Sequence, residues 1–421
     1  MILRPRVRRQ AVQRSLQILF SIILIWTCYD IWAVRRAAHT QSQIPNPSFP
    51  SDQKIFIASL HWTDEIVLRE HWISAIVQLA EDIGSPNVFI SAYGSGSLDN
   101  TEAALRELED ELRTRGIPHA VVFDGATHQD EVSKAPAESG WIRMPATKSY
   151  RGYSTDYFTL SKDEWVPRRI PYLARLRNEV MRPLYEQQGK GIVYDKVLWL
   201  NDVVFTSNDV RTLLATRGGD YAAACALDFK KAPVFYDTFA LRDAQGFAPL
   251  ADTWPYFQSA SSRNALKQSQ PVPVASCWNG MLAFDAAPFY DAQQPLKFRG
   301  IPDDLAFSHL EGSESCLVHA DNPLSAEKGV WINPNIRVGY DGIAYNLVNA
   351  RKWPSSLEIV VGVWRNRFMR WLPLSNLYTS RRTVSRKEKK WKTQNPDREE
   401  KGAFCLIDEM QILLHNGWGH A

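Results

Sequence analysis

The sequence predicts an α/β protein whose core is a mostly parallel sheet flanked by helices. Two observations support this class. Short apolar runs, which suit buried strands, alternate along the chain with stretches whose apolar residues recur every three or four positions, which suit helices. The chain has 421 residues, of which 45% are hydrophobic and 23% charged, so it is long enough for a large core or for two domains.

The first half of the chain supplies three units of this alternation. Strands are expected at residues 55–60, 88–92 and 116–123. A helix between the first two strands is predicted from apolar residues at helical spacing, ended by Gly84. These residues are Leu68, Trp72, Ile76, Leu79 and Ile83.

A second helix is expected from Leu105 to Leu112. It is preceded by Asp99-Asn-Thr-Glu102, which has the form of a capping box. Residues 124–168 are irregular and rich in Gly, Pro, Ser and charges, so we expect a long loop there that can lie over a site.

The second half continues the pattern with a helix from Pro171 to Leu184 and strands at 197–200, 220–228 and 330–340. Residues 54–350 are therefore expected to form one α/β domain. Residues 351–421 are expected to form a C-terminal extension, helical or irregular, that docks on it.

The N-terminal residues predict a membrane anchor. Residues 1–14 are basic and residues 15–34 are mostly apolar; twenty helical residues rise about 30 Å, enough to cross a bilayer. Five Arg precede the span and two follow it, which places the N-terminus in the cytosol and the body in a secretory lumen. Residues 35–53 read as a polar, Pro-rich stalk. A cleaved signal peptide is the alternative, but no clear cleavage site follows.

The charge distribution argues against a nucleic-acid partner. The chain carries a net charge of +3, and residues 1–36 alone contribute +6, from seven Arg and one Asp. The remainder is therefore slightly acidic, whereas binding of phosphate backbones needs a basic face.

Five cysteines occur, and none forms a CxxC pair, so a structural zinc site is not expected. Cys28 lies in the apolar span. The other four can form two disulfides or remain buried free thiols, and the sequence leaves both alternatives and the connectivity open. These four are Cys225, Cys277, Cys316 and Cys405.

Asp202 follows the apolar run 197–200 at the point where the strand should end. Ligands bind beyond the carboxyl ends of strands in open α/β sheets, and a carboxylate there can hold a divalent cation that binds a diphosphate. The alternative is that Asp202 caps a turn or a following helix.

Several other polar residues suit a site at the same sheet edge. The turn containing Ser95, Ser97 and Asp99 can approach an anion or a ribose, although a plain strand-to-helix turn explains it equally simply. Arg177 and Asn178 can reach a diphosphate or a nucleobase, with a solvated basic face as the alternative.

Trp278 offers a face on which a sugar can stack, and Asn279 offers donors and an acceptor for hydroxyls. Asp237, Asp243 and Glu314 follow later turns, and each taken alone is more often a turn residue than a catalytic one. We expect His319 to be structural.

Taken in order, these motifs resemble one family, the fungal capsule-associated α-1,3-mannosyltransferases of glycosyltransferase family 69. The resemblance covers roughly residues 54–345, and the ordered set is far more specific than any single motif. The motifs are Ile57-Ala-Ser-Leu60 with Glu65, Ile90-Ser-Ala-Tyr-Gly-Ser-Gly-Ser-Leu-Asp-Asn-Thr101, Arg169-Ile-Pro-Tyr-Leu-Ala174 with Arg177-Asn178, Leu200-Asn-Asp-Val203, Phe235-Tyr-Asp-Thr238 with Arg242-Asp243, Ser276-Cys-Trp-Asn-Gly280, Glu314-Ser-Cys-Leu317 and Asn333-Pro334.

The resemblance implies a GT-A-like, Rossmann-related fold, GDP-mannose as donor, a divalent cation (usually manganese), and a mannose-containing glycan as acceptor. It also implies a type II protein of a secretory-pathway membrane, with the Golgi as the expected compartment. Asn201-Asp202 would occupy the place of a metal-binding DxD, with Asn where the first Asp is expected. Gly94 and Ser315 are further departures, replacing an expected Glu and an expected Cys.

The roles implied are as follows. Asp202 would hold the cation, with Asn201 beside it. Ser95, Ser97 and Asp99 would hold the nucleoside end, and Arg177 and Asn178 the diphosphate or base. Trp278 and Asn279 would shape the sugar or acceptor pocket. Asp237, Asp243 and Glu314 would orient or deprotonate the acceptor hydroxyl in a retaining transfer.

Two other functions are considered. A glycoside hydrolase would need two carboxylates flanking a sugar and no nucleotide site. A non-catalytic glycan-binding protein, derived from a transferase that has lost activity, would fit the departures at Asn201 and Gly94.

Overall fold

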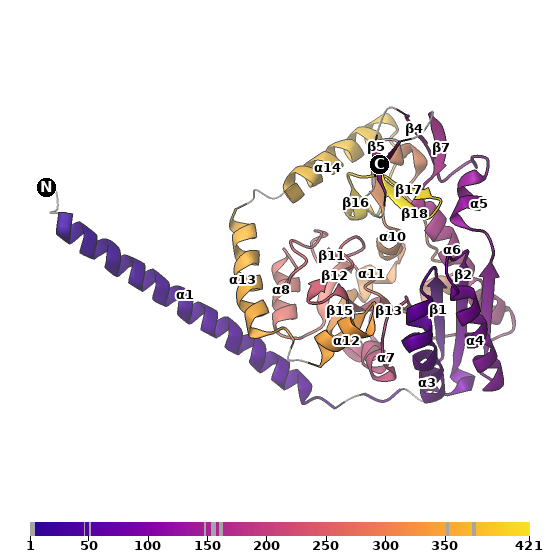
Figure 1. The fold of residues 1–421 in the computed structure, drawn as a ribbon, viewed down its shortest axis with the longest axis horizontal. Coiled ribbons are helices and arrows are strands. Elements are labelled where there is room, and N and C mark those ends of the chain that lie inside the picture. Colours follow the sequence, from indigo (N-terminus) through magenta and orange to yellow (C-terminus); the bar gives the residue numbers. More distant parts are fainter. Residues whose placement is uncertain are drawn as a thin grey trace.

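The computed structural model describes residues 5–45, 47–49, 52–146, 149–152, 157–159, 163–350, 353–372 and 376–421. One long helix, α1 (Pro5–Ser42), extends away from a body in which helices surround a central sheet (Figure 1). Both the α/β class and the mixed sheet flanked by helices are confirmed.

The central sheet has the strand order β11-β12-β15-β9-β13-β8-β1-β2-β3, and β10 pairs with β9. Strands β3, β2, β1 and β8 are parallel, in the 3-2-1-4 order of a nucleotide-binding half-sheet. Strand β13 is antiparallel to both β8 and β9. The strands are β1 (Ile55–His61), β2 (Val88–Ser95), β3 (His119–Asp124), β8 (Lys196–Leu200), β9 (Ala223–Lys231), β10 (Val234–Phe235), β11 (Arg242–Asp243), β12 (Val272–Ser276), β13 (Met281–Asp285) and β15 (Val330–Gly339).

The pleat of the strands divides the core between the two faces of this sheet. Phe56, Val197 and Trp199 pack with α6 residues on one face. Their neighbours Ile57 and Leu198 pack with α3 and α4 residues on the other face. Successive side chains of a strand point to opposite sides, so a continuous apolar run is what a sheet covered on both faces requires.

The expected helices cover these faces. Gly84 ends α3 with a φ of 94°, as predicted. The capping box predicted before α4 is wrong, because the N-cap is Asn100 and it makes no side-chain capping bond; Asp99 instead accepts hydrogen bonds from Thr101 and Glu65. The helices are α2 (Glu65–Val67), η1 (Leu68–Trp72), α3 (Ile73–Ile83), η2 (Ser85–Asn87), α4 (Thr101–Thr114), α6 (Arg169–Gly189), α7 (Ser207–Leu214), η3 (Thr216–Gly219), α8 (Ala260–Lys267), η4 (Ala287–Tyr290), α9 (Asp303–Ala306), α10 (Glu314–Asp321), α11 (Leu324–Glu327) and α12 (Gly342–Asn349).

The segment expected to be a long loop contains regular structure in its described parts. It forms α5 (His128–Ser133) and the short strands β4 (Trp141–Met144), β5 (Ser149–Gly152), β6 (Tyr157–Thr159) and β7 (Glu164–Pro167). Strand β5 pairs with β18 at the far end of the chain, and such a partner leaves no local pattern in the sequence.

The C-terminal residues are closely tied to the body. They form α13 (Ser356–Trp371), α14 (Asn376–Gln394), η5 (Ala403–Cys405) and the strands β16 (Leu406–Ile407), β17 (Gln411–Leu414) and β18 (Gly417–His420). Strand β16 pairs with β14 (Glu311–Gly312), and Cys405 is bonded to Cys316 of α10. A second disulfide joins Cys225 to Cys277, so of the two alternatives that the sequence left open the four cysteines form two bonds, and only Cys28 is free among the described cysteines.

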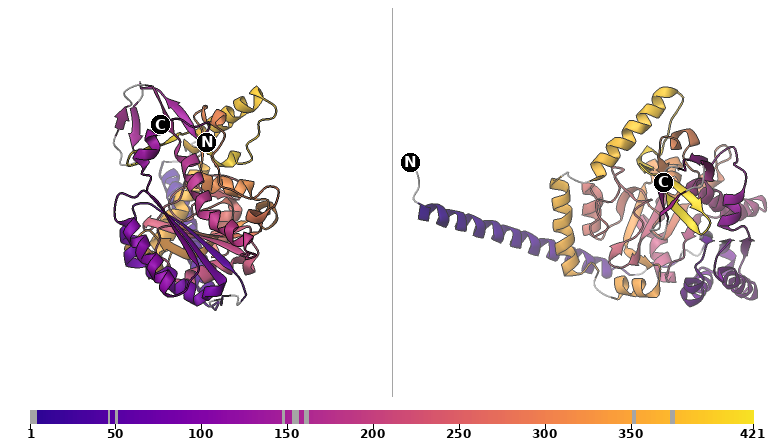
Figure 2. Two further views of the ribbon diagram at one scale, coloured as in Figure 1. Left: turned by 90° about the vertical axis from the view of Figure 1, so that its right-hand side faces the viewer. Right: turned by 45° about the horizontal axis from the view of Figure 1, so that its top comes forward.

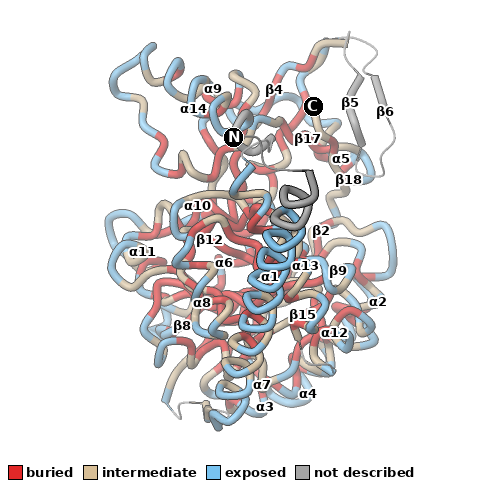
Figure 3. The backbone as a smooth tube through the Cα atoms, turned by 90° about the vertical axis from the view of Figure 1, so that its left-hand side faces the viewer, coloured by how far each residue is buried: buried red, intermediate tan, exposed pale blue. Residues whose placement is uncertain are grey.

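Helix α1 is longer than the predicted span, with 38 residues that would rise about 57 Å. It continues into residues expected to form the tail and the stalk, and ends shortly before Pro45 and Pro47, which cannot continue it. The Val12–Ser42 portion is long and apolar enough to cross a membrane, and most of it is exposed (Figure 3). The sheet and the helices that cover it lie beyond one end of α1 (Figure 2).

Candidate functional site

Asp202 lies directly beyond the end of β8, in the middle of the central sheet between β1 and β13. The adjacent turn at Asn279-Gly280 fixes this strand end, because the Asn201 N–H donates to the Gly280 carbonyl at 2.9 Å. Gly280 has a φ of 72°, and a Cβ there would lie 2.8 Å from Cγ1 of Val203. Only glycine allows the two backbone segments to approach this closely.

The carboxylates of Asp202, Asp228 and Asp237 lie around the Asn279-Gly280 turn. Asp237 donates its N–H to Asp228 Oδ1 at 3.1 Å and accepts from the Asn279 N–H at 3.2 Å. The Tyr340 hydroxyl donates to Asp228 Oδ2 at 3.2 Å. Burial and the charges of Asp228, Asp202 and Asp237 raise the pKa of Tyr340, so all three acids lie within electrostatic reach of this hydroxyl.

The acids of this cluster resist ionisation. Burial, then the charge of Asp64, raises the pKa of Asp202 to about 6. Burial, then the charge of Asp237, raises the pKa of Asp228, and burial likewise raises that of Asp237. Carboxylates crowded in this way are stabilised by a nearby cation, because it offsets both their desolvation and their mutual repulsion.

A cationic and aromatic group borders the cluster. Arg177 stacks on Trp278, 4.1 Å from the ring centroid, and its Nε donates to Glu314 Oε1 at 3.0 Å. The Trp278 indole N–H donates to Asn201 Oδ1 at 3.1 Å. The amide oxygen of Asn201 is thus engaged by Trp278, so an Asn here orients the aromatic ring whether or not it also contacts a metal.

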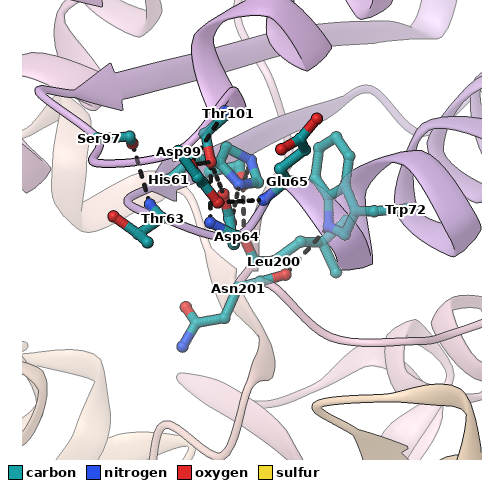
Figure 4. A network of polar contacts seen from close by, with 11 residues as sticks. His61, Thr63, Asp64, Glu65, Trp72, Ser97, Asp99, Thr101, Leu200 and Asn201 are labelled. Atoms are coloured by element: carbon teal, nitrogen blue, oxygen red, sulfur yellow. Dashed lines mark hydrogen bonds and ion pairs between the residues drawn. The ribbon is translucent and has the colours of Figure 1, made fainter.

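A buried polar network connects the ends of β1 and β8 (Figure 4). Ser59 donates to the Leu200 carbonyl at 2.8 Å and lies 2.6 Å from His61 Nε2, while His61 Nδ1 lies 2.7 Å from Asp64 Oδ2. The Trp72 indole donates to the Asn201 carbonyl at 3.0 Å.

The same network continues to the serine-glycine turn after β2. The Asp64 N–H donates to the Thr101 hydroxyl, whose oxygen lies 2.5 Å from Asp99 Oδ1. Asp99 Oδ2 accepts from the Glu65 N–H, and the Ser97 hydroxyl accepts from the Thr63 N–H. Ser97 and Asp99 are therefore held against the segment that follows β1, the neighbour of β8 in the sheet, and Figure 4 shows these residues together with Asn201. Ser95 is buried and its hydroxyl pairs with that of Tyr172 at 3.0 Å.

Two predicted site residues are engaged elsewhere. Asn178 exchanges hydrogen bonds with the backbone of Phe298 in both directions. Asp243 is fully buried and accepts from the N–H groups of Gln245, Phe247 and Ser259, which is the bonding of a turn-forming carboxylate. His319 is buried against Phe284 and donates to the Cys277 carbonyl, as a structural histidine does.

The residues of the cluster and network that were not among the predicted site residues include His61, Asp64, Asp228 and Tyr340. The sequence did indicate Asp228, because it is the acid at the end of the strand predicted over 220–228. No pattern in the sequence indicated Tyr340, because the pairing of β15 with β9 brings it to the cluster.

The described residues contain no group of three or more His, Cys, Asp and Glu side chains arranged to hold a metal by themselves. The site at Asp202 instead fits a cation that has one carboxylate ligand from the protein, with oxygens of a diphosphate and of water as its other ligands. Two cavities, of about 830 and 750 Å³, lie elsewhere: one is lined by the end of α1 and the other by residues such as Asp195 and Tyr290.

The protein family described as Cryptococcal mannosyltransferase 1 matches residues 54–321, which is more than half of the chain. The chain belongs to this family. The match begins where the α/β domain was expected to begin and includes the residues of the acid cluster except Tyr340.

Similar proteins include one curated member. The alpha-1,3-mannosyltransferase CMT1 of Cryptococcus neoformans var. neoformans (serotype D, strain JEC21) is 26% identical over 222 residues, which cover 48% of this chain and 44% of that protein. The similarity thus spans less than half the length of this relative.

Among solved structures, the mannosyltransferase PcManGT from Pyrobaculum calidifontis, in complex with GDP-Man and Mn²⁺, is similar with a TM-score of 0.37 and 10% identity, covering 92% of this chain and 87% of that one. The mannosyltransferase Ktr4p from S. cerevisiae is similar with a TM-score of 0.26 and 10% identity, covering 64% and 67%. Structural similarity at TM-scores this low carries no argument, so the assignment of the chain to its family rests on the family match.

Proposed function

We propose that this chain is a membrane-anchored glycosyltransferase that transfers mannose from GDP-mannose to a mannose-containing glycan with the help of a divalent cation. The observation that carries the proposal is the acid cluster at the end of β8, in which Asp202 has a pKa raised to about 6 and lies beside an Arg-Trp pair, in a chain of this family.

In this proposal, Asp202 holds the cation, manganese being the first candidate. A divalent metal would act as a Lewis acid and neutralise the charge that develops on the departing diphosphate. Arg177 contributes positive charge beside the diphosphate while stacked on Trp278. The Ser97 and Asp99 turn, held by the network of Figure 4, contacts the nucleoside.

The acceptor end of the site is assigned to Asp237 and Glu314, with Trp278 and Asn279 shaping the sugar pocket. The acceptor hydroxyl attacks the anomeric carbon of mannose, its proton passes to a carboxylate, and the bond from that carbon to the diphosphate oxygen breaks. Asp237 suits the proton acceptor, because burial raises its pKa and makes it a stronger base. An α-configured donor giving an α-linked product makes this a retaining transfer, so the hydroxyl attacks either from the face that the diphosphate leaves or after a carboxylate has formed a covalent intermediate.

We also propose that α1 is an uncleaved type II anchor of a secretory-pathway membrane, the Golgi in the first instance, with residues 54–421 in the lumen. Two disulfides in the body support this, because such bonds persist in oxidising compartments.

The test is transfer by the full-length chain. It is purified in detergent and incubated with GDP-mannose, manganese and an oligomannose acceptor, and product mass and GDP release are measured. We expect Asp202→Asn, which preserves shape but removes the charge, to lower kcat/KM at least about 100-fold, since a Lewis-acid metal contributes several kcal/mol. Asp110→Asn, on the exposed surface of α4, is the matched control and should retain full activity.

Manganese-dependent transfer that survives Asp202→Asn would show that the cation is held elsewhere. Binding of GDP-mannose without transfer would favour the non-catalytic glycan-binding function, and cleavage of the glycan without any nucleotide sugar would favour a hydrolase. Thermal protection by GDP but not UDP would support the assigned base.

A further inference from the structure

The outward face of α13 is unusual for a helix on a globular body. Its most exposed residues include Leu357 (72%), Val361 (54%), Phe368 (53%) and Trp371 (53%). Their spacing of four, seven and three residues places them on one side, here called the α13 stripe. The opposite side is buried, and it carries Asn366 and Arg367 beside Ile359 and Val363. The usual arrangement, with an apolar face inward and a polar face outward, is thus partly reversed.

Helix α13 is held in this orientation by close packing. Gly362 lies against the loop after β11, where an added Cβ would come within 1.8 Å of the Trp254 carbonyl oxygen. Asn366 donates to the Phe257 carbonyl at 3.1 Å. Rotation of the helix to bury the α13 stripe would break both contacts.

Helix α13 also packs against the C-terminal half of the apolar span predicted within α1. The Trp364 indole donates to Thr27 at 2.9 Å and lies edge-on to Trp26, with ring centroids 5.7 Å apart. Arg367 stacks on Trp26 at 3.8 Å and pairs with Asp30 at 2.7 Å. Lys267 of α8 pairs with the same carboxylate at 3.2 Å.

These contacts place the α13 stripe beside the exposed apolar surface of α1. Leu16, Phe20, Leu24 and Trp32 are between 52% and 67% exposed. Figures 1 and 2 show α13 lying across α1 at the junction between its projecting part and the body. If α1 spans a bilayer, the segment from Trp26 to Asp30 lies near its surface, and the α13 stripe lies at about that depth.

We propose that α13 is an interfacial helix whose stripe is immersed in the surface of the bilayer that α1 crosses; this rests on the membrane span proposed above. The chemistry suits a lipid interface. Trp371 is of the residue type that favours the headgroup region, and Leu357, Val361 and Phe368 are exposed apolar side chains that can reach toward the acyl chains. The catalytic body is thereby attached to the membrane at two places, the span and α13.

The test uses the full-length chain in lipid nanodiscs. Cys28, the only free cysteine among the described residues, is replaced in Cys28→Ser, and single cysteines are introduced for labelling with an environment-sensitive fluorophore. The test site is Val361→Cys. Leu24→Cys in the span is the positive control, and Thr114→Cys, exposed at the end of α4 on the far side of the body, is the negative control.

We expect the label at 361 to emit at shorter wavelength than the label at 114 and to be quenched by lipids brominated on the acyl chain, as the label at 24 should be. Quenching at 24 with none at 361 would overturn the α13 proposal alone. No quenching at either site would overturn the membrane span as well. A blue-shifted but unquenched label at 361 would show that a protein surface, such as a second copy of the chain, covers the α13 stripe. Phe368→Cys, labelled in the same way, provides a second position on the stripe. None of these outcomes depends on transferase activity.

Discussion

Trp278 joins the cationic and the acidic parts of the site. Its ring lies under Arg177 and its indole N–H is bonded to Asn201, next to the proposed metal ligand. Arg177 is in turn paired with Glu314. A change in any of these side chains therefore alters the position of the others, and single substitutions here should not be additive.

The turn at Asn279-Gly280 gives a prediction at the same scale. Gly280→Ala would place a Cβ 2.8 Å from Val203 in a left-handed conformation, so we expect it to lower the free energy of unfolding by about 2 kcal/mol. It should also reduce transfer, because Val203 follows Asp202 directly. Thermal unfolding of the purified chain measures the first effect.

The control is Gly189→Ala near the end of α6, where no atom lies within 4 Å of the added Cβ. It should leave stability unchanged or slightly increased. Equal stability of the two variants would mean that the close approach at Gly280 is not required.

Some of these residues could be predicted from the sequence and others could not. The place of Asp202 just beyond a strand end could, because an apolar run followed by an acid is a local pattern. Asn201 was expected at the place of the first Asp of a metal-binding DxD. Its bond to Trp278 depends on β13 pairing beside β8, which no local pattern indicates. The carboxylate of Asp243 is a suitable catalytic group by type, but three backbone amides engage it.

At the scale of elements, α10 connects the site to the C-terminal segment. It carries Glu314 toward Arg177, and its Cys316 is bonded to Cys405. The ring of His319 is buried, donates Nε2–H to the Cys277 carbonyl at 2.6 Å, and has no partner at Nδ1. It is therefore held as the neutral imidazole.

This histidine predicts an acid-dependent loss of stability. Burial lowers the pKa of His319 to about 4, from an ordinary value of 6.5. Between these values the unfolded chain binds a proton that the folded chain does not. Its contribution to stability is therefore full above about pH 6.5 and is lost as the pH falls toward 4, by on the order of 3 kcal/mol.

We expect His319→Gln, whose amide can still donate to Cys277, to flatten the pH dependence of thermal unfolding between pH 6.5 and 4. His415→Gln, at an exposed position, should leave the profile unchanged. A profile for His319→Gln as steep as that of the unaltered chain would assign the acid sensitivity to other groups.

The elements differ in how well the sequence predicted them. Long, buried strands such as β1 and β2 and the helix that ends at Gly84 were predicted, because burial on both faces or on one stripe leaves a pattern in the chain itself. Strands β5 and β18 were missed, because they are short and part of their pairing is with each other, far apart in the chain, in addition to the local partners β6 and β17.

At the scale of the whole molecule, the basic N-terminus, the apolar helix and the disulfide-bonded body predict one orientation. In sealed microsomes, a tag at the N-terminus should be digested by added protease, whereas the body should be protected until detergent is added. Digestion of the body in intact vesicles would reverse the proposed topology. A small tag is suited to this test, because the reporter should not change the positive charge that directs insertion.

Asp30, within α1, pairs with both Arg367 and Lys267, which belong to two different helices of the body. A flexible connection would let the body of an enzyme move through a wide volume around its membrane anchor. A joint locked by two ion pairs would instead hold the reaction centre at a set height above the lipid. Glycans would then be elongated only where their growing ends reach that level, so the geometry of the joint would itself help to choose which chains are extended.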